Sequence, residues 1–317
     1  MKAVVTAWRT DEPPDYMVLP IGGHAQRYYA TAEDVPGGVE DEEYKTDALL
    51  MRRIHAKGRT FRMGSPRGET GRLSSEDGHL VSFTYDYWIS VYEITQSQHE
   101  KAKGTLPASC GATGEDDSAI RPVTGCSYSM LCGGSNDNDK RNWARGENGP
   151  LCRFRSDTGM EKLDLPTDAE WEFACRAGSS AAIGADGNAT TNELGICAAL
   201  EDIAWYKSNS EGEIHPVGLK EPNAWGLYDM LGIAAEMVWD GYKASLGNAA
   251  MTDPFQPFTG GTGGVFRRGG SYLNLPGNCR AAMRPCCWTQ WHNFDNYQNT
   301  GANYATECGY RVAIYIP

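Results

Sequence analysis

Short apolar segments separated by long glycine-rich tracts limit the fold of this chain more than any other feature of its sequence. The tracts 111–117, 133–149, 184–192 and 259–264 have neither helical nor strand periodicity, and the 317 residues include 37 glycines. Irregular backbone inside a compact domain needs its polar groups satisfied by side chains, water or ions. The pattern therefore predicts an α+β domain with small antiparallel sheets, two main helices and much irregular structure.

Two segments predict the helices. In LPTDAEWEFACRAG, Thr167 is a suitable N-cap, Glu170 completes a capping box, and Gly178 ends the helix, with apolar side chains sharing one face. The second helix is expected in QSQHEKAKG, which follows Thr95 and also ends in glycine. Strands are expected in FRMGSP, VSFTYDYWISVYEIT, VFRRGGSY and GYRVAIYI, and the last two are expected to be neighbours.

Charge and hydropathy exclude several classes of partner. A formal net charge of -12 without any basic block argues against nucleic acid. No apolar run approaches the roughly 18 to 20 residues of a membrane span, and the start, MKAVVTAWRT, is too short for the apolar region of a signal peptide. Residues 1–46, rich in Pro, Gly, Asp and Glu, are predicted to form an N-terminal extension to a domain over 47–317.

The ten cysteines leave two interpretations open. No C-x-x-C pair occurs and no cysteine lies near a spaced histidine pair, so a structural zinc site is not expected. Buried free thiols are the favoured interpretation, and one or two disulfides are the alternative.

A set of motifs places the chain beside a known superfamily. FRMGSP, YEITQSQHE, RPVTGCSY, LPTDAEWEFACRAG, HPVGLKEPNAWGLYDMLG, FRRGGSY, NCRAAMR and GYRVA follow one another over residues 60–314. In this order they resemble the formylglycine-generating enzyme and sulfatase-modifying factor superfamily. The resemblance implies one large domain with an elaborated C-type lectin-like fold, in which a small antiparallel sheet and two helices support long loops.

The catalytic pair of that superfamily is not retained. Members that generate formylglycine bind copper through two cysteines shortly after the GGS turn, and here these positions fall on Asn274 and Cys279. Cu(I) prefers soft thiolates, so replacing one with an amide predicts no copper site and no such enzyme activity. Adjacent Cys286 and Cys287 are no substitute because successive side chains diverge. An oxidoreductase that uses Cys279 remains the alternative.

A calcium site is implied by the resemblance. The family commonly holds Ca²⁺ with the stretch that here reads YDMLGIAAE. Matched by position, Asp229 and Glu236 supply carboxylates, and Gly232 and Ala234 supply backbone carbonyls, which are the hard ligands that Ca²⁺ requires. Acidic turn residues without an ion are the alternative, because the stretch departs from the family's GNxWEW pattern at Ile233, Ala235 and Met237.

One branch of the superfamily is not enzymatic: the variable proteins of diversity-generating retroelements. They resemble this chain in ending with GGS, a C-R-x-A-x-R segment, a hypervariable run and a terminal G-[FY]-R strand. The resemblance implies ligand binding through a variable region over about 272–300, where mutagenesis of AAY codons cannot produce Trp or Gln. Trp288 and Trp291 are then fixed anchors, and the candidate variable residues are Leu273, Asn274, Leu275, Cys286, Cys287, Thr289, His292, Asn293, Phe294, Asp295, Asn296, Tyr297 and Asn299.

The composition of this region is suited to recognition. Aromatic side chains bury large areas at low entropic cost, and Asn, Asp, His and Thr add adaptable hydrogen bonds. We therefore expect a protein or cell-surface ligand to bind residues 273–299, with the chain in the cytoplasm or carried to a virion or cell surface by an accessory route. Alternatively, Trp288 and Trp291 are core residues within a solvated loop, or the chain is a structural part of a phage or surface assembly.

Overall fold

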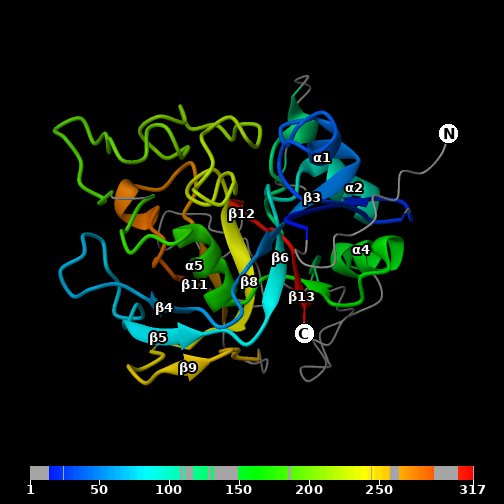
Figure 1. The fold of residues 1–317 in the computed structure, drawn as a ribbon. Coiled ribbons are helices and arrows are strands. Elements are labelled where there is room, and N and C mark those ends of the chain that lie inside the picture. Colours follow the sequence, from blue (N-terminus) through cyan, green and yellow to red (C-terminus); the bar gives the residue numbers. More distant parts are fainter. Residues whose placement is uncertain are drawn as a thin grey trace.

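The computed structural model describes residues 14–23, 25–107, 110, 117–127, 130–131, 149–184, 187–243, 245–257, 264–288 and 306–316, with the backbone alone for 264 and 286–288. Figure 1 shows the arrangement of these elements. In chain order they are β1 (Tyr16–Pro20), β2 (Arg27–Tyr29), α1 (Glu43–Thr46), β3 (Ala48–Ile54), β4 (Thr60–Met63), β5 (His79–Ser82), β6 (Asp86–Ser90), α2 (Gln96–Lys103), η2 (Ser118–Ile120), α4 (Pro150–Thr158), β7 (Leu163–Asp164), α5 (Asp168–Arg176), β8 (Ala235–Gly241), β9 (Met251–Thr252), β10 (Gly264–Arg268), η3 (Pro276–Asn278), β11 (Cys286–Trp288), β12 (Cys308–Gly309) and β13 (Ala313–Ile316).

The described strands form three small sheets. The first has the order β2-β1-β3-β6-β13-β7, the second β11-β10-β8-β12, and the third β4-β5-β9. Most pairs are antiparallel, but β12 runs parallel to β8 and β9 runs parallel to β5. Short helices and long irregular connections join the sheets, which confirms the predicted α+β class.

Both predicted helices form with the expected caps. Thr95 begins α2 and Thr167 begins α5, and each side chain accepts a hydrogen bond from the backbone three residues later within a capping box. The nine-residue helix α4 and the short α1 were not predicted. The sequence signal for α4 is the proline at its first position, Pro150, followed by a left-handed glycine, Gly159, at its end.

The expected pairing of the two C-terminal strand segments is wrong. VFRRGGSY gives β10, which pairs with β8 and β11, whereas GYRVAIYI gives β13, which pairs with β6 and β7. The chain crosses from one sheet to the other between β12 and β13. A strand pattern in the sequence carries no information about its partner, so only the tertiary structure decides the pairing.

The described part of the predicted N-terminal extension contributes to the first sheet. Strand β1 pairs with β3 over five residue pairs and with β2 on its other side. Met17, Val18 and Leu19 are at most 1% exposed. The apolar residues in this segment therefore pack into the domain, and α1 leads directly from it into β3.

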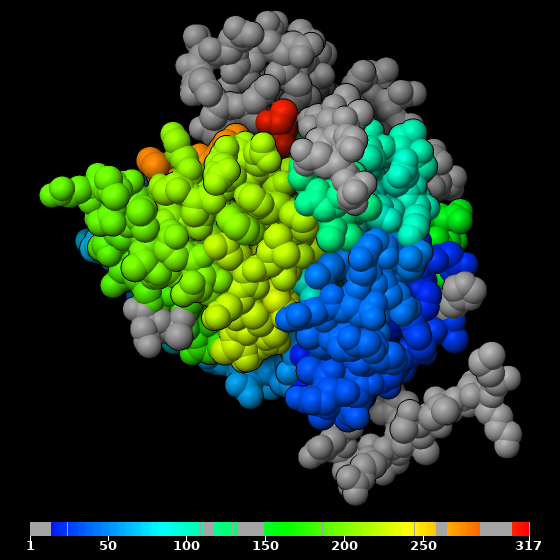
Figure 2. Space-filling model, turned by 90° about the horizontal axis from the view of Figure 1, so that it is seen from above, coloured from blue at the N-terminus to red at the C-terminus, as the bar shows by residue number. Residues whose placement is uncertain are grey.

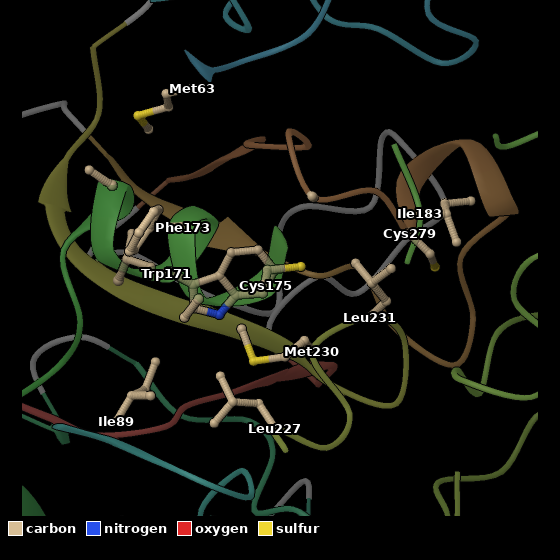
Figure 3. Close-up of a cluster of buried hydrophobic side chains, with 14 of the residues drawn as sticks. Met63, Ile89, Trp171, Phe173, Cys175, Ile183, Leu227, Met230, Leu231 and Cys279 are labelled. Carbon is tan, nitrogen blue, oxygen red and sulfur yellow. The ribbon is translucent and has the colours of Figure 1, made fainter. Parts of the chain in front are cut away.

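The largest apolar cluster surrounds α5. Trp171 is fully buried and lies in this cluster with Met230 and Leu231, as Figure 3 shows. Its indole nitrogen donates a hydrogen bond to Glu236 on β8, which ties the helix to the second sheet. Within the described residues, none of the helices has the length and apolar character required to cross a membrane.

Candidate ligand-binding site

Two strands at opposite edges of the second sheet flank residues 289–305, which include part of the region 272–300 that the sequence predicts to bind ligand. Strand β11 precedes these residues at one edge, and β12 follows them at the other. Three strand spacings of roughly 4.8 Å separate these edges by about 14 Å. Residues 289–305 themselves lie outside the described part of the chain.

A loop over residues 271–278 is hydrogen-bonded to Glu307, which directly precedes β12. The buried Glu307 carboxylate accepts hydrogen bonds from the hydroxyl of Ser271 and from Asn274 Nδ2, the latter at 3.2 Å. The backbone of Glu307 is held to β8, because its carbonyl accepts a hydrogen bond from the Ala235 amide at 2.9 Å. In Figure 2, the orange and red parts of the chain reach the surface close to each other on this side.

The predicted variable residues divide into two groups in the structure. Leu273 and Leu275 are 40% and 58% exposed, whereas the side chain of Asn274 between them faces the interior network. Cys286, Cys287 and Trp288 form the edge strand β11. The other predicted residues lie outside the described part of the chain: Thr289, Trp291, His292, Asn293, Phe294, Asp295, Asn296, Tyr297 and Asn299.

The two positions matched to the copper-binding cysteines are engaged in the scaffold. Cys279 is fully buried, and burial raises the pKa of its thiol to about 12, so the thiol is protonated at neutral pH. It lies under the GGS turn, where a Cβ on Gly270 would approach its Sγ to 2.8 Å. Asn274 Oδ1 accepts a hydrogen bond from the Ser271 amide at 3.2 Å. Instead of two thiolates, these positions hold a buried, protonated thiol and an amide side chain that is already hydrogen-bonded to Ser271 and Glu307.

The carboxylates matched to the calcium site each keep one unused oxygen. Asp229 accepts a hydrogen bond from Gly218 at 2.7 Å through Oδ2, and Glu236 accepts two bonds through Oε2, whereas Asp229 Oδ1 and Glu236 Oε1 have no partner. Burial raises the pKa of Asp229 to about 6. Free carboxylate oxygens suit a hard cation. In the described residues no three His, Cys, Asp or Glu side chains converge as metal ligands, so an ion here would depend on backbone carbonyls such as those of Gly232 and Ala234.

Sequence reasoning missed the role of the motif arginines. Four of them are at most 1% exposed, and each forms an ion pair with a buried carboxylate. They make the polar face of α5 part of the core, because Asp168 and Glu172 pair there with Arg268 from β10. The sequence signal is that arginine recurs in the C-terminal motifs: Arg268 in FRRGGSY, Arg280 and Arg284 in NCRAAMR, and Arg311 in GYRVA.

The described cysteines confirm the favoured interpretation of free thiols. Cys110, Cys126, Cys152, Cys175, Cys197, Cys279 and Cys308 are not disulfide-bonded, and all except Cys152 are buried.

Comparisons with known proteins agree with this architecture. The family model described as "Sulfatase-modifying factor enzyme 1-like domain" matches residues 41–293. A curated relative, "Chaperone protein LppX" from Paenibacillus barcinonensis, is 26% identical in a 203-residue alignment that covers 54% of this chain and 68% of that protein.

Two solved structures share the fold. "Treponema denticola variable protein 1" is 25% identical with a TM-score of 0.59, and the similarity covers 84% of this chain and 95% of that one. PvdO from Pseudomonas aeruginosa is 23% identical with a TM-score of 0.57, over the same shares of the two chains. The fold is thus the predicted C-type lectin-like fold of this superfamily. The chain belongs to the family of sulfatase-modifying factor enzyme 1-like domains.

Proposed function

We propose that this protein is a non-catalytic ligand-binding protein that presents residues 273–299 on a C-type lectin-like scaffold and is diversified by a retroelement. The observation that supports it most is the exposure of two predicted variable residues on a loop with a fixed base. Leu273 and Leu275 are exposed on a loop that Glu307 connects to the start of β12. The similarity to a protein named variable protein 1 supports the same proposal.

An oxidoreductase acting through Cys279 is the second candidate, favoured by the family and by the cysteine that follows the GGS turn. Against it, the Cys279 thiol is buried and its pKa is raised by burial, and the partner position carries Asn274. Copper chemistry would require that thiol to become an exposed thiolate. We therefore place ligand binding first.

The ligand is proposed to be a protein or a cell-surface molecule, because Leu273 and Leu275 are exposed and the predicted variable region is rich in aromatic residues, which suits a protein-like surface. A structural Ca²⁺ held by Asp229, Gly232, Ala234 and Glu236 is proposed to brace β8 beneath this face. Display on a virion or cell surface through an accessory route is the proposed location.

Binding is tested with the full chain immobilised against an array of cell-surface proteins, followed by substitution of Leu275 with Asp. A central apolar contact is worth about 2 kcal/mol, so binding should weaken by about thirtyfold. Leu219→Asp is the matched control, since Leu219 has the same 58% exposure but lies on another loop. Equal losses in the two variants would contradict the proposed face.

Diversification is tested separately by sequencing the surrounding locus. A reverse transcriptase gene and a template repeat that differs from codons 273–299 only at adenines are expected. Their absence would refute the retroelement and leave the binding test standing.

A further inference from the structure

Glu307 is a buried carboxylate held by neutral donors. Its side chain accepts hydrogen bonds from the Ser271 hydroxyl and from Asn274 Nδ2, and it is 3% exposed. It lies two residues after segment 289–305 and directly before β12. One side chain therefore fixes the position of the 271–278 loop relative to β12.

Asn274 uses all of its polar groups inside the scaffold. Its Nδ2 donates to Glu307, and its Oδ1 accepts from the Ser271 amide at 3.2 Å. Its backbone carbonyl accepts from Lys207 at 3.0 Å, and its backbone amide donates to the Ser271 carbonyl at 2.9 Å. A ligand that took over these bonds would release the loop from the scaffold, whereas the exposed flanking leucines can be contacted without that loss.

We infer that Glu307 is the positioning residue of the ligand-binding face and that Asn274 is a fixed scaffold residue instead of a variable contact. The inference deepens the proposed function and rests on it for the identity of the face. Through Asn274 and Ser271, Glu307 sets how Leu273 and Leu275 are presented beside β12. The fixed and variable positions of the loop thus alternate: Leu273 outward, Asn274 inward, Leu275 outward.

The test reverses the polarity of the hydrogen bond. Asn274→Asp places two carboxylates against each other, and Glu307→Ala removes the acceptor. In the double variant Asn274→Asp with Glu307→Gln, the amide at 307 donates to the carboxylate at 274, so a donor–acceptor pair is restored. Asn248→Asp is the control for charge, because Asn248 is exposed and gains the same negative charge.

The probe is an antibody fragment selected on the wild-type chain and chosen because Leu275→Asp abolishes its binding. Asn274→Asp and Glu307→Ala should each weaken its binding by about tenfold, and the double variant should recover to within about threefold of wild type. Amide hydrogen exchange in residues 271–278 and 306–309 should accelerate and recover in parallel. Exchange in β3 and β6 reports whether the rest of the fold is intact.

Wild-type binding by both disruptive variants would overturn the inference. So would a double variant that fails to recover, whether or not β3 and β6 stay protected. Because the antibody fragment takes the place of the natural ligand, the result does not depend on whether this face binds one. Failure of the proposed function would appear instead in the array experiment with Leu275→Asp.

Discussion

Arg311 should be among the most costly residues to replace in this chain. It is fully buried, and its Nε donates to Glu236 Oε2 at 2.7 Å. Its Nη1 and Nη2 donate to the carbonyls of Ser90 and Tyr228, each at 3.0 Å, so one side chain joins β6, β8 and the segment before β8. Glu93 lies nearby, where burial and the neighbouring Glu236 raise its pKa well above the ordinary value. Without Arg311, these acidic groups lose their cation.

The expected cost of Arg311→Met follows from this geometry. Breaking a buried ion pair by removing one partner costs about 3 to 5 kcal/mol, because the remaining charge stays buried without compensation. The two backbone carbonyls also lose their donor, so the upper end of this range is expected. Adding Glu236→Gln removes the stranded charge and should recover about 1 to 3 kcal/mol.

Urea unfolding followed by tryptophan fluorescence measures these differences. Arg153→Met is the matched control, because Arg153 is 57% exposed in its ion pair with Asp157 and should contribute less than about 1 kcal/mol. If Arg311→Met costs no more than Arg153→Met, or if Glu236→Gln makes the double variant less stable still, the buried pair does not hold the sheets together as argued.

Three further outcomes are expected. Burial lowers the pKa of His99 to about 4, so the stability that its neutral form contributes is complete above pH 6.5 and is lost as the pH falls toward 4. The loss of unfolding free energy over this pH range should be roughly 3 kcal/mol. In urea unfolding measured across pH, His99→Gln should flatten the dependence between pH 4 and 6.5, and an unchanged slope would refute the role of His99. Calcium at a hundredfold excess over Kd should stabilise the chain by roughly 2 to 3 kcal/mol in thermal unfolding, and Asp229→Asn should remove the effect; no stabilisation of the wild type would exclude a structural ion. Titration with Cu(I) against a chromophoric chelator should show no tight site, and a stoichiometric site that disappears in Cys279→Ser would restore the oxidoreductase.

The candidate site was predictable only in part. The resemblance to retroelement variable proteins placed Leu273, Asn274 and Leu275 in one candidate variable cluster. It did not separate them, since the inward direction of Asn274 depends on Glu307, 33 residues later. Likewise, α5 was predicted from its caps and apolar spacing. The burial of its polar face, however, depends on Arg268, which belongs to strand β10.

Local chemistry in the sequence determined the α+β class, the capped helices α2 and α5 and the family, because capping, periodicity and ordered motifs act over a few residues. The tertiary structure decided which strands pair, that β1 belongs to the first sheet, and which carboxylate each motif arginine meets. These choices depend on contacts between residues far apart in the chain. Removing both partners of an ion pair from water costs free energy, which their attraction offsets only where the tertiary fold brings them into contact, and no local pattern records that pairing.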